Sequence, residues 1–76
     1  MSQKSLKDAK DLLNQKEYEK AVDVCKEILM WNSANYNAYV FMGLALQNLQ
    51  NYIESEKAYL KAVELEKGSI LAYQVW

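Results

Sequence analysis

Few side chains in this sequence have the chemistry of a catalyst, and those that do lack the neighbours that catalysis needs. Cys25 is the single cysteine, and the 76-residue chain has no His that would activate its thiol as a nucleophile. Carboxylate pairs such as Glu54/Glu56 are two residues apart, and such residues do not face each other in a helix. A metal site needs a cluster of ligands, which one Cys and no His do not supply. The sequence therefore predicts a protein that is not an enzyme and that binds neither a metal nor a cofactor.

The charge balance argues against nucleic acid as a direct ligand. Nine Lys stand against ten Asp and Glu, for a net charge of −1, and there is no Arg. Arg supplies most bidentate contacts to bases and phosphates, so its absence weakens an RNA-binding interpretation. Six of the nine Lys lie in the first 26 residues, but acidic residues are interleaved with them. This pattern is typical of a mixed solvated face, and we expect no direct nucleic-acid binding.

Compartment signals point to the cytoplasm, with the nucleus as an alternative. A single Cys excludes an internal disulfide and suits a reducing compartment. The polar start of the chain does not resemble a signal peptide. The longest run of apolar residues and Gly, Ala38 to Leu46, has nine residues and is too short to cross a bilayer.

Apolar residues recur with the spacing of helices throughout the chain, and no strand pattern competes with them. Ser2 or Ser5 can cap the first helix, and Gly68 and Ser69 stand where one helix would end and another begin. The pattern predicts helices that end near Gln15, run over 18–31, 37–49 and 52–66, and begin again at Ile70.

The sequence repeats itself with a period of 34 residues. Small residues recur at equivalent positions, Ala9 with Gly43 and Ala21 with Ser55, and allow paired helices to approach closely. This period is the signature of stacked helix–turn–helix repeats and predicts an all-α array. The identities at this period are Leu12/Leu46, Asn14/Asn48, Tyr18/Tyr52, Ala38/Ala72 and Tyr39/Tyr73.

These residues resemble the tetratricopeptide-repeat family. Its pattern, Trp-x2-Leu-Gly-x2-Tyr followed by Ala-x3-Phe, is matched by Tyr39-x2-Met42-Gly43-x2-Leu46 and then Ser55-x3-Tyr59. The first unit matches less well, with polar residues at two usually apolar positions, as would suit an N-terminal cap. The resemblance implies a right-handed α–α superhelix with repeats at 1–34 and 35–68 and the start of a third, truncated repeat at 69–76. It also implies protein–protein scaffolding without catalysis.

A closer resemblance is to the large tetratricopeptide scaffold subunits of the Superkiller (Ski) complex, at their N-terminal repeats. The stretches that carry it are 12–26, 35–43, 58–66 and 71–74. It implies a scaffold that supports an RNA helicase in cytoplasmic, exosome-mediated mRNA decay. The implied partners are the RNA helicase and WD-repeat subunits of that complex and the cytoplasmic exosome.

A long uncharged segment is the best candidate for a binding surface. No residue from Ile28 to Ile53 is charged, and in such repeats the first helix of each pair lines the concave groove. An apolar strip edged by amides would suit an apolar helix or an extended peptide. Alternatively, Val40 and Leu44 only pack on neighbouring helices. The predicted groove residues are Leu6, Lys10, Leu13, Asn14, Asn37, Val40, Leu44, Gln47 and Asn48.

Two further hypotheses concern other modes of association. The alternative function is that of a generic tetratricopeptide adaptor or co-chaperone. Chaperone-binding tetratricopeptide domains hold a partner's C-terminal carboxylate with a set of Lys and Asn side chains. This sequence does not match that set, since Leu44 and Phe41 occupy two of its positions. An apolar C-terminal helix without a following partner predicts self-association. The residues expected to mediate it are Ile70, Leu71, Tyr73, Val75 and Trp76.

Overall fold

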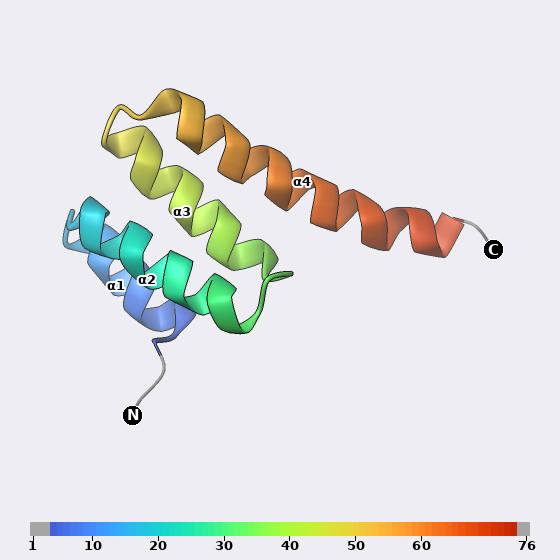
Figure 1. The fold of residues 1–76 in the computed structure, drawn as a ribbon, viewed down its shortest axis with the longest axis horizontal. Helices are drawn as coiled ribbons and strands as arrows, with labels where there is room; N and C mark the ends of the chain where they lie inside the picture. Colours follow the sequence, from blue (N-terminus) through green and yellow to red (C-terminus); the bar gives the residue numbers. More distant parts are fainter. Residues whose placement is uncertain (1–3, 75–76) are drawn as a thin grey trace.

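The computed structural model describes the backbone of residues 4–74 and the side chains of residues 4–66. Over that part of the chain, all regular structure is helical: α1 (Leu6–Asn14), α2 (Tyr18–Trp31), α3 (Tyr36–Asn48) and α4 (Tyr52–Gln74). Each helix packs antiparallel on the next, α1 also contacts α3, and the far half of α4 extends beyond the other helices (Figure 1). The predicted all-α fold is confirmed.

Local hydrogen bonds account for the starts of α1 and α3. The Ser5 hydroxyl accepts from the Asp8 amide at 3.4 Å, and the Asp8 carboxylate accepts from the Ser5 amide at 3.0 Å. This reciprocal capping box satisfies amides that a helix start leaves unpaired. Asn35 caps α3 in the same sense, since its Oδ1 accepts from the Ala38 amide at 3.0 Å. Ser5 and Asp8 are therefore polar because they begin a helix.

The turns that end α1 and α3 have the same geometry, 34 residues apart. Lys16 and Gln50 both adopt a φ of 63°, in the left-handed region. The amides of Lys16 and Glu17 donate to the carbonyls of Leu13 and Leu12 at 3.0 and 2.8 Å, and the amides of Gln50 and Asn51 repeat the pattern. This is the Schellman motif, here built on residues that lack the conformational freedom of Gly. The sequence repeat is thus also a repeat of backbone conformation.

The core lies between α1, α2 and α3 and consists of small and medium side chains. One cluster is centred on Cys25 and Ile28 of α2, and the other on Ala21 and Val22. Met42 of α3 and Leu12 of α1 pack against both clusters. Burying these side chains is what holds short helices together, because helices of this length are marginal in isolation.

Helices α3 and α4 approach closely where the sequence places small residues. Gly43 is buried, and its carbonyl accepts from the Ser55 hydroxyl at 2.8 Å. Ala58 and Ala62 are buried on the same side of α4, and the Tyr59 ring lies over Gly43. The predicted packing of the small residues is confirmed here, whereas Val63 on another side of α4 is 44% exposed.

The predicted break at Gly68 is absent, because α4 runs without interruption from Tyr52 to Gln74. Gly and Ser inside a helix cost about 1 and 0.5 kcal/mol relative to Ala, and only Pro imposes a break. Within the part of the chain that the structure describes, α4 packs on α3 and contacts neither α1 nor α2, so no packing contact favours a change of direction after Gly68. A fifth helix starting at Ile70 was therefore a wrong prediction, whereas the division into repeats stays a prediction. Ile70, Leu71 and Tyr73 lie on α4, and Val75 and Trp76 lie outside the described residues.

Candidate protein-binding surfaces

One face of α3 is free of charge and open to solvent. Ala38 and Ala45 are buried and Gly43 faces α4, so the opposite side of the helix remains available. On that side Val40 is partly buried and Leu44 is 39% exposed, and polar side chains surround them. The exposed polar residues of this face are Asn37, Gln47 and Asn48.

Helix α1 contributes less to this face than its sequence predicts. Lys10 and Asn14 are exposed, as a groove would need. Leu6 and Leu13 are instead partly buried and pack against the two core clusters. The apolar part of the predicted groove is thus concentrated at Val40 and Leu44.

The amides on α3 are already partly engaged within the molecule. The Asn48 Nδ2 donates to the Leu44 carbonyl at 2.8 Å, and the Gln47 Oε1 accepts from the Tyr59 hydroxyl at 3.3 Å. Asn48 therefore keeps a side-chain oxygen and Gln47 keeps its NH₂ group. One acceptor and one donor are what an extended peptide backbone would pair with.

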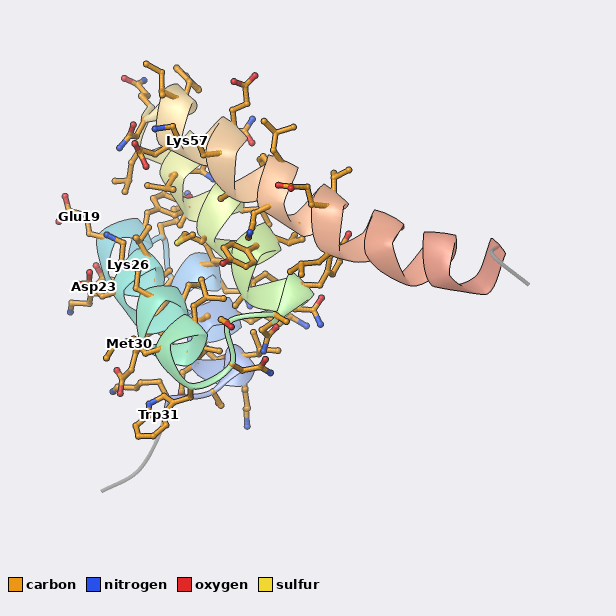
Figure 2. The ribbon with its side chains drawn as sticks, turned by 45° about the vertical axis from the view of Figure 1, so that its right-hand side comes forward. Glu19, Asp23, Lys26, Met30, Trp31 and Lys57 are labelled. Atoms are coloured by element: carbon orange, nitrogen blue, oxygen red, sulfur yellow. The ribbon has the colours of Figure 1, made fainter. Side chains whose placement is uncertain are left out.

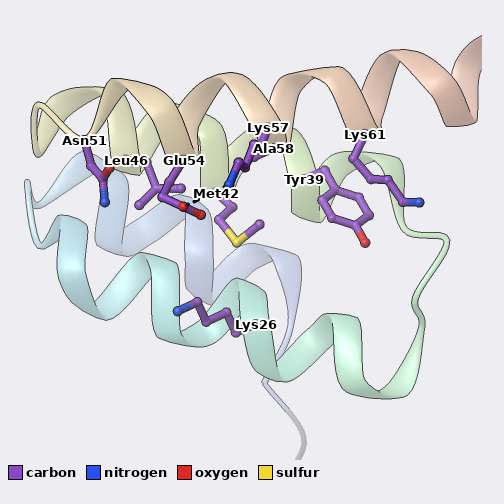
Figure 3. A pocket seen from close by; sticks show the side chains of 9 residues that line it. All are labelled: Lys26, Tyr39, Met42, Leu46, Asn51, Glu54, Lys57, Ala58 and Lys61. Atoms are coloured by element: carbon purple, nitrogen blue, oxygen red, sulfur yellow. Dashed lines mark ion pairs between the residues drawn. The ribbon is translucent and has the colours of Figure 1, made fainter.

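A second hollow lies on the other side of α3, between α2 and α4. Its volume is about 430 Å³, and Met42 and Tyr39 project into it from α3 (Figure 3). Lys26 borders it from α2, and an ion pair between Lys57 and Glu54, 3.6 Å long, borders it from α4. The full lining is Lys26, Tyr39, Met42, Leu46, Asn51, Glu54, Lys57, Ala58 and Lys61. We call this hollow the α2/α4 groove.

The α2/α4 groove was not among the predicted sites. Its floor residues, Tyr39, Met42 and Leu46, recur with helical spacing and are indistinguishable in sequence from core residues. The one available signal was the pair Lys57 and Lys61, four residues apart on one face of a helix. The third lysine, Lys26, lies opposite this pair only because of the angle at which α2 crosses the neighbouring helices.

The environment of Cys25 does not suit a nucleophile. The side chain is fully buried, and burial raises the pKa of the thiol from 9.0 to about 11. A thiol needs a depressed pKa and access to solvent in order to react. Within the described residues, no group of three His, Cys, Asp or Glu side chains is placed to hold a metal ion. In the same part of the chain, no helix is both long and apolar enough to cross a bilayer.

Two of the described tyrosines also have raised pKa values, for different reasons. A side-chain hydrogen bond with Glu66 and the negative charge of that carboxylate raise the pKa of Tyr36. Burial raises the pKa of Tyr59. Both hydroxyls connect α3 to α4, so these shifts are explained by packing and do not indicate an acid–base site.

Comparison with known proteins agrees with the repeat geometry. Residues 36–69 match the model of the tetratricopeptide repeat. The chain is 43% identical to human Superkiller complex protein 3 over 70 residues, which are 92% of this chain and 4% of that protein. It is 42% identical to Tetratricopeptide repeat protein 37 of Xenopus laevis over 69 residues, 91% of this chain and 4% of the relative.

A more distant relative matches over a longer part of the chain. Superkiller protein 3 of Schizosaccharomyces pombe is 39% identical over 74 residues, 97% of this chain and 5% of that protein. The chain thus spans about 4 to 5% of the length of these curated relatives. No solved structure matches it significantly. Residues 36–69 therefore match the tetratricopeptide repeat, in an all-α helical-repeat chain that is similar to Superkiller complex protein 3 over most of its length.

Proposed function

We propose that this chain is a protein-binding segment of a scaffold without catalytic activity, and that it acts in a Ski complex. In that role it would support an RNA helicase in cytoplasmic, exosome-mediated mRNA decay. The observation that carries the proposal is the similarity of nearly the whole chain to proteins named after the Superkiller complex. The structure adds support, because stacked helical repeats offer extended surfaces for partners.

The exposed face of α3 is the proposed partner groove. Val40 and Leu44 supply apolar area, and Asn48 and Gln47 each keep one hydrogen-bonding group. An extended peptide or an apolar helix fits that chemistry. Lys10 and Asn14 of α1 extend the same proposed groove with polar groups.

The test is affinity purification of the protein that carries this chain, tagged in its source cells, followed by mass spectrometry. An RNA helicase, a WD-repeat protein and exosome subunits are expected to co-purify. Recovery of chaperones in place of RNA-decay factors would contradict the Ski assignment. It would favour the alternative, a generic tetratricopeptide adaptor or co-chaperone.

A matched pair of variants tests the face of α3. Leu44→Glu places a charge among the proposed contacts, whereas Met30→Glu places the same charge on α2, where the side chain is 83% exposed. Recovery of at least one partner should fall about tenfold for Leu44→Glu, as for loss of a central apolar contact, and remain unchanged for Met30→Glu. Equal recovery with both variants would remove this face from the proposal.

A further inference from the structure

The α2/α4 groove combines an apolar floor with a positively charged rim. Tyr39, Met42 and Leu46 lie three and four residues apart, so they share one face of α3, and each is only partly buried. Ala58 of α4 completes the apolar lining. This apolar surface is recessed between two helices but still open to solvent. Covering it with another apolar group lowers the free energy of the system, because apolar area is removed from water.

The charges around this floor do not cancel. Lys26 on α2 and Lys57 and Lys61 on α4 face a single carboxylate, Glu54, so the lining carries a net charge of +2 in a chain whose net charge is −1. Glu54 is paired with Lys57. Within the described side chains, Lys26 and Lys61 take part in no ion pair. Figure 2 shows Lys26 and Lys57 on the same side of the molecule, and Figure 3 shows Lys26 and Lys61 on opposite walls.

We propose that the α2/α4 groove is a second binding surface, and that it takes an acidic peptide segment of a partner protein. An apolar side chain of the segment covers Met42 and Leu46, and its carboxylates pair with Lys26 and Lys61.

The same lysines do not favour RNA as the occupant. The lining has no Arg and includes a carboxylate, Glu54, which would repel phosphates. Single-stranded nucleic acid needs aromatic platforms for its bases, and Tyr39 is the only aromatic side chain in the lining. An apolar floor between lysines, with only one aromatic ring, suits apolar side chains flanked by carboxylates.

This inference deepens the proposed function, because it rests on the chain being a protein-binding scaffold. The two are nevertheless separable. The proposed partner groove lies on the exposed face of α3, and the α2/α4 groove lies on the opposite side of that helix. A partner bound only to the first face would leave the scaffold function intact and this inference wrong.

The test is to pan a phage-displayed library of random dodecapeptides on the 76-residue chain and to measure the selected peptides by fluorescence polarisation. Enriched peptides should combine Glu or Asp with large apolar residues. The Lys26→Glu/Lys61→Glu variant should bind them about tenfold or more weakly, because two rim ion pairs are replaced by repulsion. Lys26→Gln/Lys61→Gln should cause a smaller loss. The matched control, Lys4→Glu/Lys7→Glu at and just before the start of α1, makes the same change in net charge at exposed positions outside both proposed surfaces and should bind normally.

Several results would overturn the inference. They are a failure to enrich acidic peptides over a bare surface, unchanged affinity in the Lys26→Glu/Lys61→Glu variant, or an equal loss in the matched control. Circular dichroism establishes that the variants keep their helices. Two other occupants are tested directly, a polyuridylate oligonucleotide by polarisation and a second copy of the chain by light scattering. Binding of either one that depends on Lys26 and Lys61 would assign the groove to it and contradict the proposal.

Discussion

Gly43 is the position where a single added methyl group should reveal how closely α3 and α4 pack. A Cβ built on Gly43 would lie 2.9 Å from Cε1 and Cζ of the Tyr59 ring and 3.0 Å from Cδ1. Ordinary carbon–carbon contacts are about 3.5 to 4.0 Å. The Gly43→Ala variant therefore cannot keep the present ring position, and either the ring or the helix must move.

The size of the effect follows from two opposing terms. Overpacking a close contact costs about 1 to 3 kcal/mol. Replacing a helical Gly by Ala stabilises the helix by about 1 kcal/mol. The net expectation is a loss of about 1 kcal/mol, which for a domain of this size lowers Tm by about 6 °C. Without the Tyr59 contact, the same substitution would be stabilising.

The assay is urea unfolding followed by circular dichroism, for Gly43→Ala alone and in a Tyr59→Leu background. In the wild-type background the variant should be less stable by about 1 kcal/mol. In the Tyr59→Leu background the same substitution should be neutral or stabilising by up to about 1 kcal/mol. An equal effect in both backgrounds would show that the cost does not arise from the contact between Gly43 and Tyr59.

Two other predictions concern the turns and the buried thiol. Gln50→Gly should stabilise the chain by about 0.5 kcal/mol in the same urea assay, because Gly adopts the left-handed backbone conformation after α3 without steric strain, which outweighs the added entropy of the unfolded chain. A less stable variant would contradict the left-handed conformation at Gln50. Burial favours the neutral thiol of Cys25 in the folded state, so its contribution to stability is complete below pH 9 and is lost as pH rises toward about 11. Unfolding free energies measured across this pH range should fall more steeply for the native chain than for Cys25→Ala, and parallel curves would contradict the assignment.

The helices were predictable because their signals are local. Ser5 begins α1 through reciprocal hydrogen bonds with Asp8, three residues further along the chain, and the helix predicted at 18–31 from its apolar spacing coincides with α2. The one structural boundary that failed, Gly68, was local too. A Gly only permits a helix to end, and whether it does depends on what the next segment packs against.

The predicted groove residues differ in their exposure to solvent, and the reason lies in the tertiary packing. Asn37, Leu44 and Asn48 are exposed on α3 as expected, whereas Leu6 and Leu13 pack against the core. On an isolated helix an apolar residue that lines a groove cannot be told from one that covers a neighbour. Whether the exposed face of α3 binds a partner stays a prediction.

The helical fold and the pairs of small residues that bring the helices together were predictable from the amino-acid sequence, since caps, apolar spacing and side-chain size act over one or two turns, and the 34-residue period follows from comparing the sequence with itself. Two arrangements follow from the packing of the helices: Tyr59 lies on Gly43, and Lys26 and Lys61 stand on opposite walls of one groove. These arrangements join residues 16 and 35 positions apart in the chain. They depend on the angles at which α2, α3 and α4 cross, which no local pattern of residues specifies.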